Sequence, residues 1–381
     1  MTSVINFIRE RFTRTQPLAA GNHTYKSPAD EPAYRLHLRT MPDGSGVLIV
    51  NAATVLHLNP TATEFAYHLI KGSQPEEAAK QVASRYNINR TSALQDYGEF
   101  RDRIQALIHT PDLDPVSDLD FERVAPHSQA LTAPLRLDCA LTYRLPAGAD
   151  TSNAPTKRVD RELRTDEWKL IIDKAWQAGI PHITLTGGEP TLRPDLAEII
   201  AYIEKTGQVC GLSSDGLKLE DKGYLDSLLQ AGLDHLLFIL QPHNEGSWKA
   251  LGVIIPEDLF TTVHLTIHPD EADQAQGYLE RLSRLGVTSL SLSTSDKSLK
   301  PQMEIFRNLA SRLGLDLRWD LPVPYSNENS VAFETMEDNV PTGAGKSWLY
   351  VEPDGDVLPA QGFADQILGN LLKNSFEEIY H

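Results

Sequence analysis

The chain has 381 residues, 41% of them hydrophobic and 23% charged, so it is long enough for two or three domains and is not a mainly disordered protein. Its 52 acidic against 35 basic residues leave a net charge of −17, which makes a nucleic-acid platform a poor candidate. It has no run of about 18 apolar residues, which predicts no membrane span, and its two cysteines fit the reducing cytoplasm. Residues 1–33, with scattered charges and a weak apolar face, are interpreted as an N-terminal arm.

The first predicted domain covers residues 34–108. Apolar residues alternate from Tyr34, as in a half-buried strand, and two more short strands follow over 47–50 and 55–58. Asn59-Pro60 and Pro75 are typical helix starts, and a third helix has apolar side chains three and four positions apart. Three strands followed by three helices predict a small winged-helix-like α+β domain. The acidic segment 109–133 is interpreted as a linker.

A regular repeat marks the second predicted domain, residues 134–326. Strand starts are expected near Leu135, His182, Gln208, His235, Thr262, Thr288 and Leu315. From His182 onward these starts are 26 or 27 residues apart, and a helical pattern fills each gap. This spacing predicts parallel β/α units, in a barrel or in a doubly wound sheet. The tail, residues 327–381, breaks the rhythm with a strand over 348–351, a turn, and a hairpin partner over 356–358.

The sharpest motif is LTGGEPT, residues 185–191, at the end of the second strand of the repeat. Gly187 and Gly188 allow the backbone to approach another group closely, and Glu189 can accept hydrogen bonds from an ammonium group. A plain turn between a strand and a helix also uses glycine and proline. The motif alone therefore leaves a ligand site and an ordinary turn equally open.

With its surroundings, the motif resembles the GGEP motif of radical SAM enzymes, which receives the amino group of S-adenosylmethionine (SAM). Leu141-Thr142-Tyr143-Arg144 is similar to the run before the cluster motif of that family, and Ser213-Ser214-Asp215-Gly216 resembles the Thr-Asn-Gly that ends its third strand. The resemblance implies an α/β fold with a partial (β/α)6 TIM-like barrel over 134–326. It also implies SAM contacts from Gly187, Gly188, Glu189, Pro190 and Ser214.

The resemblance breaks at the iron–sulfur cluster. The three cysteines of the family would fall at positions that hold Leu145, Ala149 and Ser152. The tail resembles a degenerate SPASM or twitch extension, and Ala360 stands at its expected cysteine. Cys139 and Cys210 lie inside predicted strands, away from the motif spacing. We therefore expect no iron–sulfur cluster, no other certain cofactor, and at most weak binding of SAM.

Residues 34–108 resemble the PqqD-type RiPP recognition element, a module that binds the leader of a ribosomally made precursor peptide. The resemblance implies that an extended peptide pairs with the third strand of the domain and packs on its third helix. The expected contact residues are Val55, Leu56, His57, Leu58, Leu94, Tyr97 and Phe100.

Two hypotheses of different classes follow. The preferred one is a non-catalytic homologue, a pseudoenzyme, that binds a precursor peptide or a partner protein such as a cluster-bearing radical SAM homologue. Its setting would be the maturation of a ribosomal peptide or of a peptide-derived cofactor. The alternative is a cluster-independent enzyme or sensor that holds SAM or another small ligand in the barrel. His243, His264 and His268 lie near predicted strand ends, and the sequence does not decide whether they bind a metal.

Overall fold

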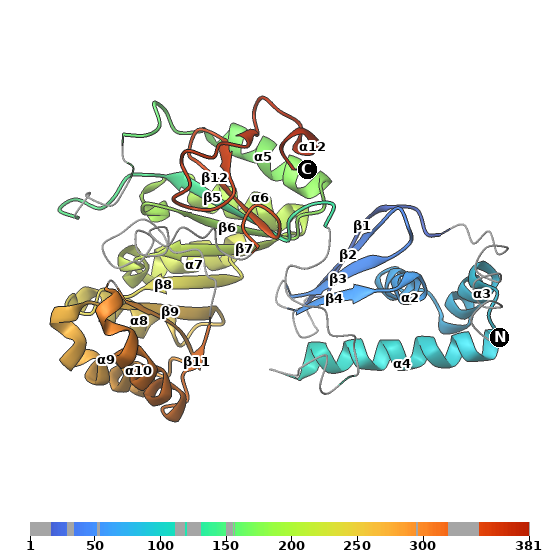
Figure 1. Cartoon of the computed structure of the whole chain (residues 1–381), viewed down its shortest axis with the longest axis horizontal. Coiled ribbons are helices and arrows are strands. Elements are labelled where there is room, and N and C mark those ends of the chain that lie inside the picture. The colour runs from blue at the N-terminus through green and yellow to red at the C-terminus, as the bar shows by residue number, and fades with distance from the viewer. Residues whose placement is uncertain are drawn as a thin grey trace. The chain divides into compact units, whose positions relative to one another are not determined.

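The computed structural model describes residues 17–28, 34–51, 54–110, 131–149, 157–294, 296–318 and 343–380, with the single positions 119 and 155. The chain divides into two compact units, Met1–Thr132 and Ala133–His381 (Figure 1). The division falls at the end of the predicted linker, most of which lies outside the described residues. Among the described residues, no helix combines the length and the apolar character that a membrane crossing needs.

Four antiparallel strands form the sheet of the first unit, in the order β1-β2-β3-β4. They are β1 (Gly21–Lys26), β2 (Arg35–Thr40), β3 (Gly46–Val50) and β4 (Thr54–Leu58). The three expected strands are confirmed as β2, β3 and β4. The interpretation of residues 1–33 as an arm is corrected at its end, because β1 pairs along the whole of β2. Its sequence, GNHTYK, has too little apolar alternation to reveal a strand.

Three helices follow this sheet: α2 (Pro60–Ile70), α3 (Pro75–Tyr86) and α4 (Arg90–His109). The predicted helix start is confirmed at Asn59, whose side chain accepts a hydrogen bond from the Ala62 amide at 2.9 Å. Apolar side chains of α2 and α4 pack on the sheet, and the rings of Phe65 and Tyr97 lie with their centroids 5.6 Å apart. The sheet and its helices therefore share one core.

The second unit contains seven parallel strands in sequential order along one sheet. They are β5 (Arg136–Thr142), β6 (His182–Gly187), β7 (Val209–Ser214), β8 (His235–Ile239), β9 (Phe260–Ile267), β10 (Ser289–Thr294) and β11 (Asp316–Leu317). The helices between them are α5 (Thr165–Gln177), α6 (Leu196–Thr206), α7 (Lys222–Ala231), α8 (Glu245–Ile254), α9 (Ala275–Arg284) and α10 (Lys300–Arg312). A doubly wound sheet reverses its strand order at a switch point among its β/α units, and the seven strands β5 to β11 do not. It is therefore of the TIM-barrel type, and it is open at β11 in the described residues.

The tail extends the same sheet at its other end. Strand β12 (Trp348–Val351) pairs in parallel with β5, and β13 (Asp356–Leu358) and β14 (Gly369–Asn370) continue antiparallel before the short helix α12 (Phe376–Ile379). The predicted strand, turn and hairpin partner are confirmed. Residues 327–342, which the tail was expected to include, lie outside the described residues.

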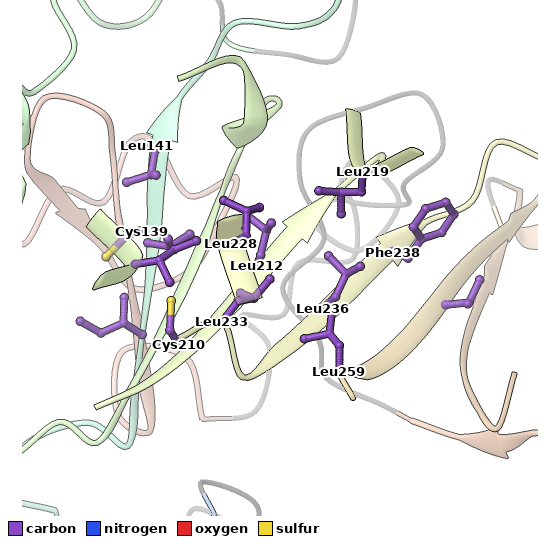
Figure 2. Close-up of a cluster of buried hydrophobic side chains, with 14 of the residues drawn as sticks. Cys139, Leu141, Cys210, Leu212, Leu219, Leu228, Leu233, Leu236, Phe238 and Leu259 are labelled. Atoms are coloured by element: carbon purple, nitrogen blue, oxygen red, sulfur yellow. The ribbon is translucent and has the colours of Figure 1, made fainter. Parts of the chain in front are cut away.

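The two faces of the parallel strands differ in chemistry. Leu137, Cys139 and Leu141 of β5 belong to the large apolar core that the helices share, and β7 contributes Cys210 and Leu212 to it (Figure 2). The residues that alternate with them point to the opposite face. There the strands β9 and β10 carry a row of buried polar side chains: Thr262, His264, Thr266, Ser289 and Ser291. The face of β9 and β10 away from the helices is thus polar, and the helix-covered side of the sheet is apolar.

Candidate functional site

The 187–190 loop leaves the carboxyl end of β6 and packs on the segment that follows β5. The amide of Gly188 donates to the Thr142 carbonyl at 2.7 Å, and the amide of Glu189 donates to the Arg144 carbonyl at 2.9 Å. A Cβ atom at Gly187, where φ is +125°, would lie 2.2 Å from the Thr142 carbonyl oxygen. The glycines are therefore required by the chain's own backbone, whereas the sequence had suggested a ligand as the reason.

The carboxylate of Glu189 is the centre of a buried hydrogen-bond network. The side chain is 3% exposed and accepts hydrogen bonds from the Thr191 amide at 2.9 Å, the Ser214 hydroxyl at 2.8 Å and the Asp215 amide at 2.9 Å. The Ser214 hydroxyl in turn accepts from the Gly216 amide at 2.9 Å. A carboxylate has about four acceptor positions, so roughly one is left for a further donor. The structure thus brings together the predicted Glu189 and Ser214 at the carboxyl ends of β6 and β7.

Asp215 places a second carboxyl group beside Glu189. Burial, with the negative charge of Glu189 as a second cause, raises the pKa of Asp215 to about 8. Burial also raises the pKa of Tyr224 to about 12, and the same Glu189 charge adds to the effect. Lys218 is the nearby cation, and its ammonium donates to the Thr191 carbonyl at 2.8 Å. The site therefore carries two neighbouring carboxyl groups, of which Asp215 keeps its proton to higher pH than usual, an arrangement suited to a cationic group.

The raised pKa of Asp215 makes stability depend on pH. Between its ordinary value of 3.8 and about 8, the folded protein holds a proton that the unfolded chain has lost, so stability falls as pH rises through that range. Asp215→Asn mimics the protonated acid and removes this slope. We expect the variant to be more stable than the wild type at high pH and the difference to shrink towards pH 4. Thermal unfolding of the wild type and of the variant, at pH 4 and at high pH, measures this difference in stability.

Asp258→Asn is the matched control, because Asp258 is exposed on the same unit. It should leave the pH profile unchanged. A profile of Asp215→Asn that runs parallel to the wild type would show that Asp215 is ionised in the folded protein throughout.

Arg193 holds the 187–190 loop in place through hydrogen bonds to the neighbouring backbone. Its guanidinium is 7% exposed and donates to the carbonyls of Leu141 and Leu163, both at 3.0 Å, while it also pairs with Asp195 at 2.7 Å. It therefore ties the end of β5 to the chain that follows the 187–190 loop. Two hydroxyls near the loop, those of Thr186 and Thr191, are buried and have no hydrogen-bond partner among the described residues. Buried polar groups normally have partners, so these two are available to a bound group.

The three histidines considered for a metal lie apart. His264 is on the polar face of β9, with Nδ1 2.9 Å from the Ser291 hydroxyl, and burial lowers its pKa to about 4, so its ring is neutral at physiological pH. His243 follows β8 and pairs with Glu271, and His268 precedes a short 3-10 helix. Among the described residues these histidines form no group that could hold a metal ion.

A groove of about 420 Å³ lies in the first unit, between the end of β4 and one face of α4. Of the predicted peptide contacts, His57, Leu58 and Phe100 line it. Tyr97 is 2% exposed and stacks in the core, Leu56 is also buried, and Leu94 is exposed elsewhere on α4. Within the described sheet, β4 has a strand partner on one side, β3. The groove therefore adjoins a free strand edge.

Several residues of these sites were not selected from the sequence. Asp215 is part of the motif over 213–216, of which only Ser214 was predicted to contact SAM. An acidic residue directly after a strand was a usable signal for Asp215 as well. The groove residues Asp96, Glu99 and Arg103 share one face of α4 with Phe100, which their spacing of three and four could have shown. Arg193 carried no signal, because its partners are backbone carbonyls far away in sequence.

Several known proteins are similar to this chain in sequence or in fold. It is 26% identical over 265 residues to a PqqA peptide cyclase of Methylobacterium sp. (strain 4-46), an alignment that covers 60% of this chain and 67% of the relative. Its fold is similar to that of Streptococcus suis SuiB, in the structure bound to SAM (TM-score 0.60, 13% identity, 94% of this chain and 88% of that one). The structure of SuiB bound to the precursor peptide SuiA gives a TM-score of 0.58 at 13% identity, over 89% of this chain and 85% of that one.

The cysteines of this chain do not fit an iron–sulfur cluster. Cys139 is 1% exposed and Cys210 is fully buried, and Figure 2 shows both among the leucine side chains of the helix-covered core. Burial raises the pKa of the Cys139 thiol well above its usual value, which opposes the thiolate that iron needs. Leu145 and Ala149 follow β5, Ala360 is buried, and Ser152 lies outside the described residues. The two cysteines of this chain therefore offer no ligand set for a cluster, and no reaction step is assigned to one.

The comparisons nevertheless overturn three expectations. Residues 139–263 match the model of the Radical SAM superfamily, a family that depends on SAM and a cluster, and this match contradicts the prediction of no cluster and at most weak SAM binding. The predictions of a non-catalytic pseudoenzyme and of a chain that is not an enzyme are also wrong, because the curated relatives are named as peptide cyclases, which are catalysts. The match of residues 139–263 lies within the second unit and runs from β5 into β9.

Proposed function

We propose that this protein is an enzyme that acts on a precursor peptide, with SAM at the 187–190 loop and the leader of the peptide on the first unit. The observation that carries the proposal is the free edge of β4 beside the groove on α4. The name of the relatives, PqqA peptide cyclase, and the binding of the precursor peptide SuiA by SuiB support the same substrate class.

The edge of β4 offers a peptide two kinds of contact. Since β4 has one strand neighbour in the described sheet, its other edge can bond an added strand, which gives affinity with little demand on sequence. The groove, with its buried floor of Leu58, Phe65 and Phe100, can take a side chain and so give selectivity. On this proposal the first unit is a winged-helix-like, PqqD-type recognition element, and Val55 and His57 face the added strand's side chains.

The 187–190 loop offers SAM a buried negative charge. The one acceptor position that its internal donors leave on Glu189 suits an ammonium group, and the hydroxyls of Thr186 and Thr191 can serve a carboxylate or a ribose. Bound SAM supplies a positively charged sulfonium centre, and the chain's own residues bind and orient the molecule around it. The tail, from β12 to α12, is on this proposal a SPASM-like extension that closes the β5 end of the sheet.

Titration calorimetry with SAM tests the cofactor half of the proposal. Full-length wild-type protein should bind SAM, and Glu189→Gln should bind at least about tenfold more weakly, since a charge-assisted hydrogen bond contributes about 1.5–3 kcal/mol. Glu198→Gln, on the exposed face of α6, is the matched control and should bind as the wild type does. If the wild type does not bind SAM, or if Glu189→Gln binds it equally well, the proposed SAM site is wrong.

Mass spectrometry tests the catalytic half. Peptides that the full chain captures are incubated with it and SAM, and a change in peptide mass is expected. If none of the captured peptides changes in mass, the protein binds peptides without modifying them, and the proposal of an enzyme is wrong.

A further inference from the structure

The groove between β4 and α4 has an ordered arrangement of charge. Along one face of α4, Asp96 and Glu99 come first and Arg103 comes last, with Phe100 between them. These positions are three, four and seven residues apart, so they lie in one row. The phenyl rings of Phe65 and Phe100, with centroids 6.2 Å apart, form the apolar floor below that row. The groove thus has an acidic end, an apolar middle and a basic end.

The three charges of this row are Asp96, Glu99 and Arg103. Among the described residues, none forms an ion pair with Asp96, Glu99 or Arg103. Glu99 accepts one hydrogen bond, from Gln95 at 2.9 Å, which leaves its charge uncompensated. The next pair on the helix behaves differently, since Arg101 and Asp102 neutralise each other at 3.2 Å outside the groove. Charges at the rim of a groove, without partners in the free protein, select the charge of what binds there.

We propose that the groove selects a peptide segment in which a basic and an acidic residue flank an apolar one, and this inference rests on the proposed function. The basic side chain lies against Asp96 and Glu99, the apolar one enters between Phe65 and Phe100, and the acidic one reaches Arg103. An extended chain rises about 3.3 Å per residue and a helix about 1.5 Å. The roughly 6–10 Å between the acidic and basic ends of the row therefore correspond to about two to three residues of the peptide.

The net charge of the chain points the same way. At −17, the protein attracts cationic segments over a distance and repels anionic ones. A mainly basic segment with one acidic residue meets both this field and the local pattern. A purely acidic segment would meet neither.

A random-peptide display library, selected on immobilised full-length protein, tests the pattern. Selected peptides should be enriched in a basic and an acidic residue about two to three positions apart around an apolar residue. A selected peptide should bind about three- to tenfold more weakly to the double variant Asp96→Lys/Glu99→Lys, and also to Arg103→Glu. Selection on each variant should reverse the preferred charge at the corresponding peptide position.

Matched controls lie next to these residues. Arg101→Glu makes the same charge change as Arg103→Glu, and Asp102→Lys makes the change of each single substitution in the double variant, on the same helix but outside the groove; both should leave affinity and preference unchanged. Peptides selected for apolar residues without a charge pattern would overturn this inference and leave the strand-addition role intact. Recovery of no peptide, or self-association of the chain through this face in sedimentation, would overturn the peptide role itself.

Discussion

Gly188→Ala is expected to destabilise the second unit by about 2–4 kcal/mol and to abolish SAM binding. A Cβ atom at this position would lie 2.2 Å from the carbonyl oxygen of Arg144 and 2.9 Å from the carbonyl carbon of Tyr143. Both are backbone atoms, so the segment after β5 must move. That movement breaks the hydrogen bonds that hold the loop on Thr142 and Arg144, and it displaces Glu189 with them. Thermal unfolding and titration with SAM measure the two effects.

Gly277→Ala is the control for this change. Gly277 is on α9, a Cβ atom there meets nothing within 4 Å, and alanine favours a helix, so stability should rise by about 0.5–1 kcal/mol. If Gly188→Ala unfolds at the temperature of the wild type, the close approach of the two backbone segments does not exist.

Glu352→Ala is expected to destabilise the second unit by about 3–5 kcal/mol. The Glu352 side chain, 2% exposed, accepts hydrogen bonds from the Tyr143 hydroxyl at 2.8 Å and from Arg158, whose Nε and Nη2 lie 2.6 and 2.7 Å from its two oxygens. Its removal leaves a buried phenol and a partly exposed guanidinium without their acceptor. Because Tyr143 directly follows Thr142, which holds Gly188, the variant should also bind SAM more weakly.

The contrast with Glu245 isolates the effect of burial. Glu245 also receives two hydrogen bonds from one arginine, Arg281, both at 2.8 Å, but its side chain is 71% exposed. Glu245→Ala should therefore cost less than about 1 kcal/mol. Equal unfolding temperatures for the two variants would mean that the Glu352 cluster is solvated.

Local sequence was sufficient for most of the fold. The seven expected strand starts of the repeat lie within two residues of those observed, because apolar runs bounded by turn residues are a local signal. The cap at Asn59 and the hairpin of the tail were predictable for the same reason. Strand β1 was missed, since a polar edge strand is specified by its partner, β2, and not by its own pattern.

What the sequence determined by itself was the alternation of elements and the stretch of chain that carries the chemistry, LTGGEPT and its neighbours. The tertiary structure alone decided what those residues contact. In the second unit it placed the two glycines against the backbone after β5, gave Glu189 three internal hydrogen-bond donors and raised the pKa of Asp215. In the first unit it buried Tyr97 and left Asp96 and Arg103 at the groove. The physical reason is that hydrogen bonding, burial and charge act between atoms close in space, and in this fold those atoms lie tens to hundreds of residues apart along the chain.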